Sequence, residues 1–242
     1  MMNNPIPILM YHSIESMPKS TVMRSLHVPT KRFEMQMKLL DMFGYKGLSI
    51  RELTPYLEGK KIGKVIGITF DDGYQNNLLN AAPILKKYNF GATSYIVSKR
   101  IGESNIWDYE QGVTQRPLMN KSEIKNWLEY GLDIGAHTQT HPLLNDLSQK
   151  ESHDEIFNCK QDLEKMFDLT IKDFCYPFGQ FNEPLIEVVR EIGYKTATTM
   201  IRGRVGLNEN FLRLPRIPIN HHTLMHLFFA KIFTRYEDKR RK

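Results

Sequence analysis

The chain has 242 residues, enough for one large domain with a substantial core. Apolar residues make up 41% and charged residues 25%, values typical of a folded soluble protein and not of a disordered one. Of the net charge of +6, +4 lies between residues 231 and 242. The preceding residues are therefore nearly neutral, which argues against a nucleic-acid-binding surface spread over the whole protein.

Cysteine content and the N-terminus bear on the compartment. Cys159 and Cys175 are the only cysteines, and nothing indicates that they pair. The first residues lack the basic and apolar segments of a signal peptide. No run approaches the roughly 18 apolar residues that a membrane-spanning helix needs. We therefore expect a cytoplasmic protein with reduced thiols. Its oligomeric state cannot be predicted from the sequence.

Short apolar runs predict β-strands, and amphipathic segments of helical length separate them. The runs are residues 7–12, 46–50, 65–70, 91–97, 132–137, 174–178, 195–200 and 213–219. Ser49, Asn120 and Ser148 each precede a glutamate by three residues, which predicts capping boxes at three helix starts. This alternation is typical of an α/β protein with a parallel sheet, and about eight strands predict a complete or incomplete (β/α) barrel.

Residues 99–120 form a long irregular connection between a strand and a helix. Such loops build the active face of a barrel, because they follow the carboxyl ends of the strands. Trp107 in this loop is a candidate for stacking on a sugar face, and packing in the core is the alternative.

Two adjacent carboxylates, Asp71 and Asp72, follow the strand at residues 65–70 and precede Gly73. A solvated turn would use the same residues. However, the carboxyl ends of the strands form the functional face of a barrel. Two carboxylates this close also repel unless a positive group lies beside them. The segment is therefore a candidate site as well as a candidate turn.

His137 and His141 follow another strand, and their spacing can bring two imidazoles onto one metal ion. A single histidine would more often be a surface or core residue. One carboxylate and two imidazoles make three protein ligands and leave a fourth position for water, as in catalytic zinc sites. The second carboxylate is then available as a base.

Residues 174–179 (FCYPFG) end a further strand, and taken alone they indicate a core strand followed by a tight turn. Together with residues 69–73 (TFDDG) and 137–141 (HTQTH), residues 176–179 resemble the motifs of the polysaccharide deacetylase family. This family is also called NodB-homology or carbohydrate esterase family 4. The segments 9–13 and 213–217 resemble its branch that deacetylates poly-N-acetylglucosamine, and the likeness extends over residues 6–220.

The resemblance implies a distorted (β/α) barrel with seven strands and metal-dependent removal of N-acetyl groups from sugars. Carried onto the matching positions, it implies that Asp72, His137 and His141 bind Zn²⁺ or another divalent metal such as Ni²⁺ or Co²⁺. It implies Asp71 as the general base and the backbone N–H of Phe178 as a donor to the oxyanion. The expected partner is an N-acetylated carbohydrate, and the products are acetate and an amine.

Two positions depart from the family pattern. Many members have an arginine that orients the base where this chain has Cys175. We hypothesise that Arg216 replaces it, and a purely structural arginine is the alternative. The family's general acid is often a histidine in a short Ile-x-His motif that His221 fits. Our candidates for the general acid are therefore His221, then His12 at the end of the first strand, then His222.

Residues 1–222 are expected to form the barrel domain, and residues 223–242 an amphipathic, basic C-terminal helix and tail. This helix either packs on the barrel or lies on an anionic lipid surface. The second alternative predicts peripheral contact with the inner face of the membrane. It also predicts a membrane-proximal substrate, such as an N-acylated sugar on a lipid-linked precursor of surface polysaccharide.

The sequence thus predicts a metal-dependent N-deacetylase that acts on a sugar of a surface polysaccharide or of its precursor. One alternative keeps the site but changes the acyl group, as in a deformylase or another C–N hydrolase. A second alternative is a catalytically inactive carbohydrate-binding module. The complete set of Asp71, Asp72, His137 and His141 argues against an inactive site. A third is a membrane or nucleic-acid tether acting through the basic tail.

Overall fold

The computed structural model describes residues 5–241, and all eight predicted strands are present in it. The strands are β1 (Ile8–Tyr11), β2 (Lys46–Leu48), β3 (Val65–Phe70), β4 (Thr93–Ile96), β5 (Asp133–Ala136), β6 (Asp173–Cys175), β7 (Thr196–Arg202) and β8 (Leu214–Pro218). The predicted strand at 174–178 ends early, because a 3₁₀ turn, η6 (Pro177–Gly179), begins at the proline.

Seven of the strands close into a parallel ring in the order β1-β8-β7-β6-β5-β4-β3, because β1 pairs with both β8 and β3. The strand β2 lies outside the ring and pairs with β3. The ring is irregular: β5 and β6 share one register pair, Ala136 with Phe174, and the pairing of β7 with β8 shifts between Thr198 and Arg202. The expected distorted, seven-stranded (β/α) barrel is therefore confirmed.

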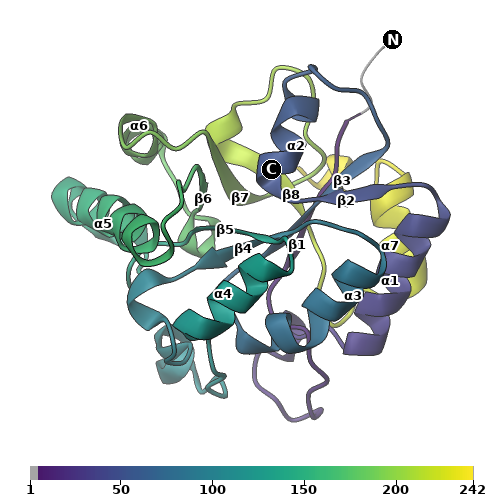
Figure 1. Ribbon diagram of the computed structural model, residues 1–242, viewed down its shortest axis with the longest axis horizontal. Helices are drawn as coiled ribbons and strands as arrows, with labels where there is room; N and C mark the ends of the chain where they lie inside the picture. Colours follow the sequence, from purple (N-terminus) through teal and green to yellow (C-terminus); the bar gives the residue numbers. More distant parts are fainter. Residues whose placement is uncertain (1–4, 242) are drawn as a thin grey trace.

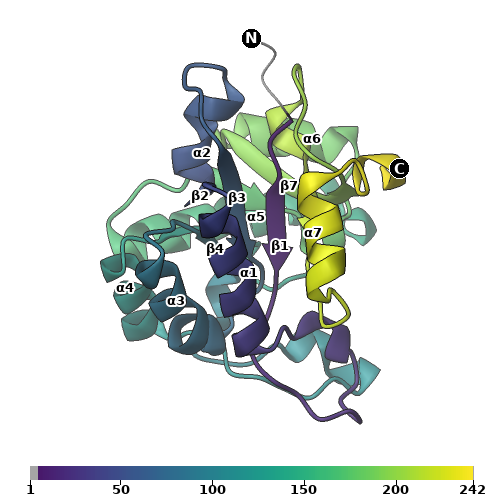
Figure 2. The ribbon, with the colours of Figure 1, turned by 90° about the vertical axis from the view of Figure 1, so that its right-hand side faces the viewer.

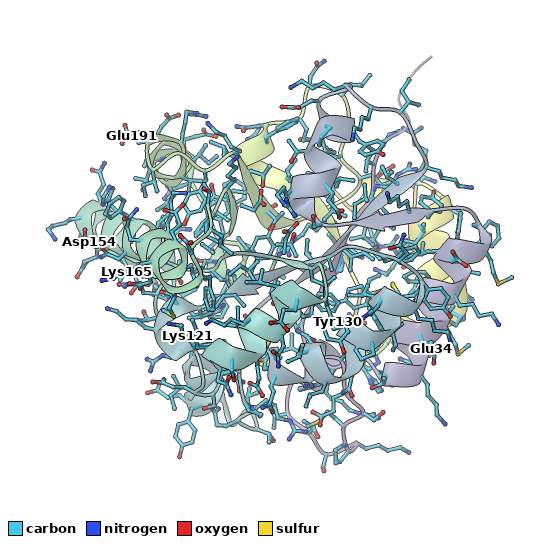
Figure 3. All side chains as sticks on the ribbon, viewed as in Figure 1. Glu34, Lys121, Tyr130, Asp154, Lys165 and Glu191 are labelled. Atoms are coloured by element: carbon cyan, nitrogen blue, oxygen red, sulfur yellow. The ribbon has the colours of Figure 1, made fainter. Side chains whose placement is uncertain are left out.

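Helices surround this ring (Figure 1). They are α1 (Thr30–Met42), α2 (Ile50–Leu57), α3 (Ala82–Lys87), α4 (Lys121–Glu129), α5 (Gln149–Phe167), α6 (Glu183–Glu191) and α7 (Met225–Phe233). The three predicted capping boxes are confirmed at the starts of α2, α4 and α5. The helices present charged side chains such as Lys121, Lys165 and Glu191 to solvent (Figure 3). Their apolar faces pack on the strands and form the core.

The C-terminal helix α7 lies beside α1 next to strand β1 (Figure 2). The ring centroids of Phe43, after α1, and Phe233, at the end of α7, lie 4.6 Å apart. Buried Glu237 binds Lys231 on α7, and it accepts two hydrogen bonds from Arg202 of β7, at 2.7 and 3.0 Å. The tail is thus held against the barrel by apolar packing and by ion pairs.

Among residues 5–241, no helix combines the length and the apolar character needed to cross a membrane. The peripheral membrane contact expected for residues 223–242 stays a prediction.

Candidate active site

The two adjacent aspartates emerge from the carboxyl end of β3, whose residues are all buried. Asp72 and Gly73 both adopt left-handed backbone conformations, with φ of 73° and 75°. This conformation costs an aspartate about 1 kcal/mol or more, and such strain clusters at functional sites. The turn gives the two neighbouring carboxylates different partners: Asp71 faces an arginine and Asp72 faces two histidines.

Asp72, His137 and His141 converge on one point. The Oδ1 atom of Asp72 lies 3.4 Å from Nε2 of His137 and 3.4 Å from Nε2 of His141. All three residues are buried, and their ligand atoms lie within 4.8 Å of one another. Burial raises the pKa of Asp72, but the two histidines outweigh this effect and hold the pKa well below its ordinary value.

The surroundings of the two histidines prepare them for a metal. Nδ1 of His137 lies 2.7 Å from the carbonyl oxygen of Cys175, so this nitrogen carries the proton and Nε2 presents its lone pair. Thr138 and His141 both have left-handed backbones, with φ of 64° and 65°. The hydroxyl of Thr138 accepts a 3.0 Å hydrogen bond from the His141 N–H, which fixes this turn. A carboxylate and two imidazoles so arranged fit Zn²⁺ or a related divalent metal.

Arg216 of β8 holds the other carboxylate. Its two terminal nitrogens each donate a 2.7 Å hydrogen bond to Asp71, one to each carboxylate oxygen. The remaining donors of this guanidinium, which is 1% exposed, reach Thr199, Thr69 and the sulfur of Cys175. Burial raises the pKa of Asp71, but Arg216 outweighs it and the pKa lies below its ordinary value. Asp71 is therefore ionised at neutral pH.

The structure brings His12 to the site but not the other two candidate histidines. Nε2 of His12 lies 3.9 Å from Oδ2 of Asp71, and His12 lines the same pocket as the candidate metal ligands. His221 and His222 are absent from the described lining of this pocket, and the His221 N–H donates to the carbonyl of Ser25 instead. The sequence motif favoured His221, whereas the geometry favours His12.

The pocket that joins these groups has a volume of about 160 Å³. Its lining residues are His12, Met23, Leu26, Asp71, Asp72, Trp107, Asp108, His137, His141, Tyr176, Phe178, Gly179 and Met200. Phe178 has a left-handed backbone, and its ring centroid lies 4.6 Å from that of His141. A Cβ on Gly179 would lie 2.7 Å from the Met200 nitrogen, so this turn requires glycine.

The loop at residues 99–120 contributes to the pocket, as expected from its place after β4. The rings of Trp107 and His141 stack, with centroids 4.4 Å apart and planes inclined by 24°. Asp108 beside it is 4% exposed, and burial followed by the charge of Asp72 raises its pKa. Sequence reasoning missed Asp108, and also Met23 and Leu26. The loop at residues 99–120 was expected at the active face, but no local motif singles out Asp108 in it, or Met23 and Leu26 in the loop before α1.

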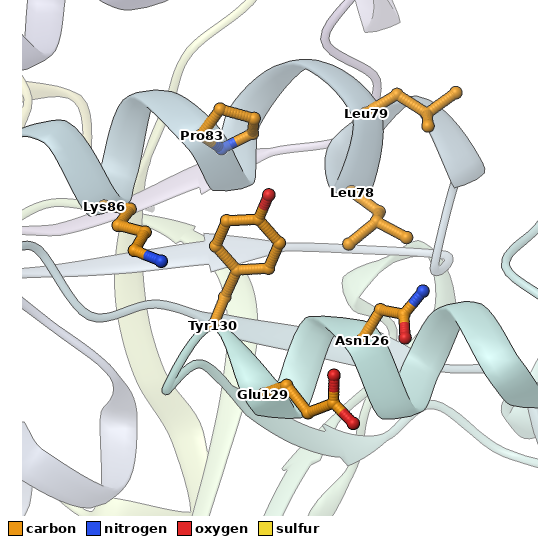
Figure 4. Close-up of a pocket in the computed structure, with 7 residues that line it drawn as sticks. All are labelled: Leu78, Leu79, Pro83, Lys86, Asn126, Glu129 and Tyr130. Carbon is orange, nitrogen blue, oxygen red and sulfur yellow. The ribbon is translucent and has the colours of Figure 1, made fainter.

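A larger groove lies on the outer surface, between α3 with the helical turn before it and the helix α4 (Figure 4). Its volume is about 530 Å³, and its side chains include one cation, Lys86, and one carboxylate, Glu129. It holds no convergent set of catalytic or metal-ligating side chains. Volume alone therefore does not identify the site, and the smaller pocket carries the chemistry.

These observations define a (β/α)-barrel hydrolase with a candidate metal centre. A carboxylate and two imidazoles lie at the carboxyl end of the closed parallel barrel, and an arginine holds a second carboxylate beside them. The model of the polysaccharide deacetylase family matches residues 58–197, more than half of the chain. The chain therefore belongs to the polysaccharide deacetylase family, as the sequence motifs predicted.

Individual relatives agree with this assignment. The chain is 33% identical over 217 residues to the polysaccharide deacetylase YxkH of Bacillus subtilis, covering 89% of this chain and 71% of that protein. It is 28% identical over 219 residues to poly-beta-1,6-N-acetyl-D-glucosamine N-deacetylase of Staphylococcus aureus, covering 86% of this chain and 73% of the relative. The structure of Streptococcus pyogenes deacetylase PplD in complex with acetate superposes with a TM-score of 0.81 at 26% identity, covering 95% of this chain and 99% of PplD.

Proposed function

We propose that this protein removes N-acetyl groups from an N-acetylated sugar of a surface polysaccharide or of its lipid-linked precursor, by metal-dependent hydrolysis of the amide bond. The observation that carries the proposal is one pocket that holds both a three-residue metal-ligand set and a separate carboxylate fixed by an arginine. The names of the relatives, which include an N-deacetylase of poly-N-acetylglucosamine, support the choice of substrate class.

The pocket is smaller than the roughly 300–1,000 Å³ of sites that enclose a whole drug-sized ligand. At about 160 Å³ it suits the acetamido group alone. The sugar ring then lies across the opening, between the exposed apolar side chains of Met23 and Phe178. This arrangement suits a residue within a longer glycan as well as one at its end.

The residues of the chain divide the reaction between them. Asp72, His137 and His141 would hold the divalent metal, which supplies Lewis acidity when bound. Asp71 is ionised because of Arg216, so it accepts a proton from the water that attacks the acetyl carbonyl carbon. The backbone N–H of Phe178 is our candidate donor to the carbonyl oxygen as that atom gains negative charge.

The departing amine must gain a proton when its bond to the carbonyl carbon breaks. We assign this role to His12, because it lines the pocket on the Asp71 side, whereas His221 and His222 do not line it. The main-chain carbonyl of His12 accepts a 2.8 Å hydrogen bond from Asn77, which fixes the end of β1 beside the site. The products are acetate and a sugar amine, which is protonated at neutral pH.

The test is acetate release by the metal-loaded protein from N-acetylglucosamine oligomers and from lipid-linked N-acetyl sugars. We expect the wild type to release acetate and a chelator to abolish this release. The Asp72→Asn variant should release no acetate and should no longer bind metal stoichiometrically. Formate release from N-formyl sugars without acetate release would instead identify a deformylase. If the protein neither binds metal nor releases an acid, the alternative of a catalytically inactive carbohydrate-binding module is favoured.

The cytoplasmic location and the contact of residues 223–242 with a membrane are part of this proposal as predictions. Sedimentation with anionic liposomes at low salt, compared between the full chain and a form without residues 223–242, tests the contact. Equal sedimentation of the two forms would contradict it.

A further inference from the structure

A cluster of basic side chains lies next to the catalytic pocket. We define this basic cluster as Arg24, Arg32, His221 and His222. Arg32 donates a hydrogen bond to the main-chain carbonyl of His221, and the rings of His221 and His222 lie 5.4 Å apart. The His221 N–H donates a 2.9 Å bond to the carbonyl of Ser25, next to Arg24. Segments far apart in the sequence therefore bring these four residues together.

The basic cluster adjoins the pocket directly along the chain. Arg24 and Ser25 lie between Met23 and Leu26, and both of these apolar residues line the catalytic pocket. The first three members of the cluster are half-buried, and His222 is exposed. A ligand that reaches from the pocket over this loop would meet the cluster.

The two arginines of the cluster lack carboxylate partners. Within residues 5–241, no carboxylate oxygen lies within 4.0 Å of Arg24 or Arg32, whereas Arg116 in the neighbouring loop pairs with Glu15 at 2.7 Å. Each guanidinium has five N–H donors. The described hydrogen bonds use one of them in each case: Arg24 donates to the carbonyl of Met17 at 3.0 Å, and Arg32 to His221. The remaining donors are available to a ligand.

The position of Arg32 adds to this excess of positive charge. It lies in the first turn of α1, a turn with no acidic residue and no side-chain cap. The positive end of a helix dipole disfavours a cation and favours an anion. Burial and the charge of Arg24 lower the pKa of Arg32, and burial and both arginines lower the pKa of His221. Nδ1 of His221 is also buried with no hydrogen-bond partner among the described residues.

We propose that the basic cluster binds a phosphate group that the substrate carries next to its N-acetyl sugar. Two guanidinium groups beside the N-terminus of a helix match the geometry and charge of phosphate oxygens. A neutral sugar homopolymer has no group that would compensate these charges. This inference rests on the proposed deacetylase function and narrows its substrate class to N-acetyl sugars joined to a phosphate or phosphodiester.

The test compares two substrates of the metal-loaded protein: the methyl glycoside of N-acetylglucosamine and an alkyl phosphodiester of N-acetylglucosamine 1-phosphate. At low salt we expect kcat/KM to be at least tenfold higher for the phosphodiester, with a preference that declines as salt is added. In the double variant Arg24→Gln/Arg32→Gln the ratio of the two values falls close to one. Lys31→Gln is the matched control, because it removes an exposed cation from the same helical turn. This control keeps the ratio.

A wild-type ratio near one, or an unchanged ratio in the double variant, would overturn the inference and leave the deacetylase function standing. If the double variant does not fold, as its melting would show, the salt dependence of the wild-type ratio decides. If neither substrate yields acetate, the assay with oligomers and lipid-linked sugars decides the proposed function separately. Titration with N-acetylglucosamine 1-phosphate then still tests the cluster, because equal affinity in the wild type and the double variant would refute phosphate binding there.

A phospholipid headgroup offers the same phosphate chemistry. Vesicles of phosphatidylglycerol form the third arm of the experiment. We expect the double variant and the wild type to sediment equally with them. A different result would overturn the substrate assignment and assign the cluster to lipid: the wild type sediments with the vesicles, the double variant does not, and the wild type shows no preference for the sugar phosphodiester.

Discussion

The two ends of the barrel each bury an aspartate, and the two residues behave in opposite ways. Asp71, after β3 at the carboxyl end, is 4% exposed, and Asp173, at the amino end of β6, is 5% exposed. Arg216 binds Asp71 and lowers its pKa, whereas burial raises the pKa of Asp173 to about 6 because its 2.6 Å hydrogen bond from Thr196 offsets burial only in part. Burial is thus nearly the same at both ends, and the partner decides in which direction each pKa shifts.

The largest effect expected from this comparison is on catalysis. Asp71→Asn removes the ionised carboxylate that accepts a proton from water, and general-base groups contribute about 10²–10⁴-fold to rate. We therefore expect kcat for acetate release to fall by a factor in that range. The metal content, measured in the same samples, should stay stoichiometric, because Asp72, His137 and His141 are unchanged.

The matched control is Asp173→Asn, which makes the same substitution at the other end of the barrel. It should retain wild-type kcat, since Asp173 lies at the amino end of β6 and is not among the residues that line the pocket. Equal loss of activity in both variants would mean that the substitutions act through the barrel as a whole and would remove Asp71 from its assigned role.

The second prediction concerns the partner rather than the carboxylate. Arg216→Ala leaves Asp71 buried without a counter-charge, and removal of one member of a buried ion pair costs about 3–5 kcal/mol of stability. A base no longer held in position also costs about 10²-fold in kcat. Chemical denaturation and acetate release measure the two effects.

Arg213→Ala is the control for Arg216→Ala. Its side chain is 45% exposed and lies 3.6 Å from Glu183, so we expect a change in the free energy of unfolding within about 0.5 kcal/mol. Full turnover in Arg216→Ala, even with lowered stability, would make Arg216 a structural residue and refute the idea that it replaces the arginine missing at Cys175.

Local patterns explain which parts of this molecule could be predicted. The strands were predictable because parallel strands covered on both faces are nearly continuous apolar runs, as in β3 (VIGITF). The metal-ligand candidates were also predictable from local sequence, because each lies in a short motif directly after a strand. By contrast, the ring closes through the pairing of β1 with β3, which leaves β2 outside. That choice depends on packing between distant segments and has no local signature.

The general-acid candidates show the same limit. His221 matched a short motif, yet the end of β1 and not the segment after β8 approaches Asp71, which gives His12 the position in the pocket. Asp108 was missed for a similar reason. It reaches the pocket from the loop at residues 99–120, and no sequence motif marks this position within the loop. Arg216 was found only as a replacement for a missing residue. Its contact with Asp71 spans 145 residues of sequence.

The third prediction uses pH to separate the two ends of the barrel. For Asp173, a folded pKa of about 6 against an ordinary value of 3.8 corresponds to about 3 kcal/mol. The folded state binds this proton more tightly than the unfolded state. Its stabilising effect is therefore full below about pH 4 and is lost as the pH rises to about 6. The wild type should lose stability relative to Asp173→Asn by up to about 3 kcal/mol over this interval.

Urea denaturation of both proteins at several pH values measures this difference. The comparison between the two proteins removes the contribution of all other titrating groups, which they share. A difference in the free energy of unfolding that stays constant between pH 4 and pH 7 would show that Asp173 has no raised pKa in the folded protein.

The smallest effect expected is where the tail meets the barrel, at a buried carboxylate that has one buried and one partly exposed cation as partners. Glu237 binds Arg202 and Lys231, and although burial raises its pKa, these cations outweigh burial and lower it. Arg202 is 38% exposed, and the glutamine keeps an oxygen that can accept from buried Lys231, which also donates to the Pro218 carbonyl. We therefore expect Glu237→Gln to cost about 1–2 kcal/mol, less than the loss of a buried partner that leaves no acceptor behind. Glu187→Gln on α6 is the control, since this glutamate, 57% exposed, pairs with Arg190 on the same helix and should change stability by under about 0.5 kcal/mol. Equal costs in the two variants would mean that ion pairing does not hold the tail on β7. Apolar packing of α7 against α1 would then remain, together with the ion pairs of Asp238 with Arg204 and of Arg241 with Glu209.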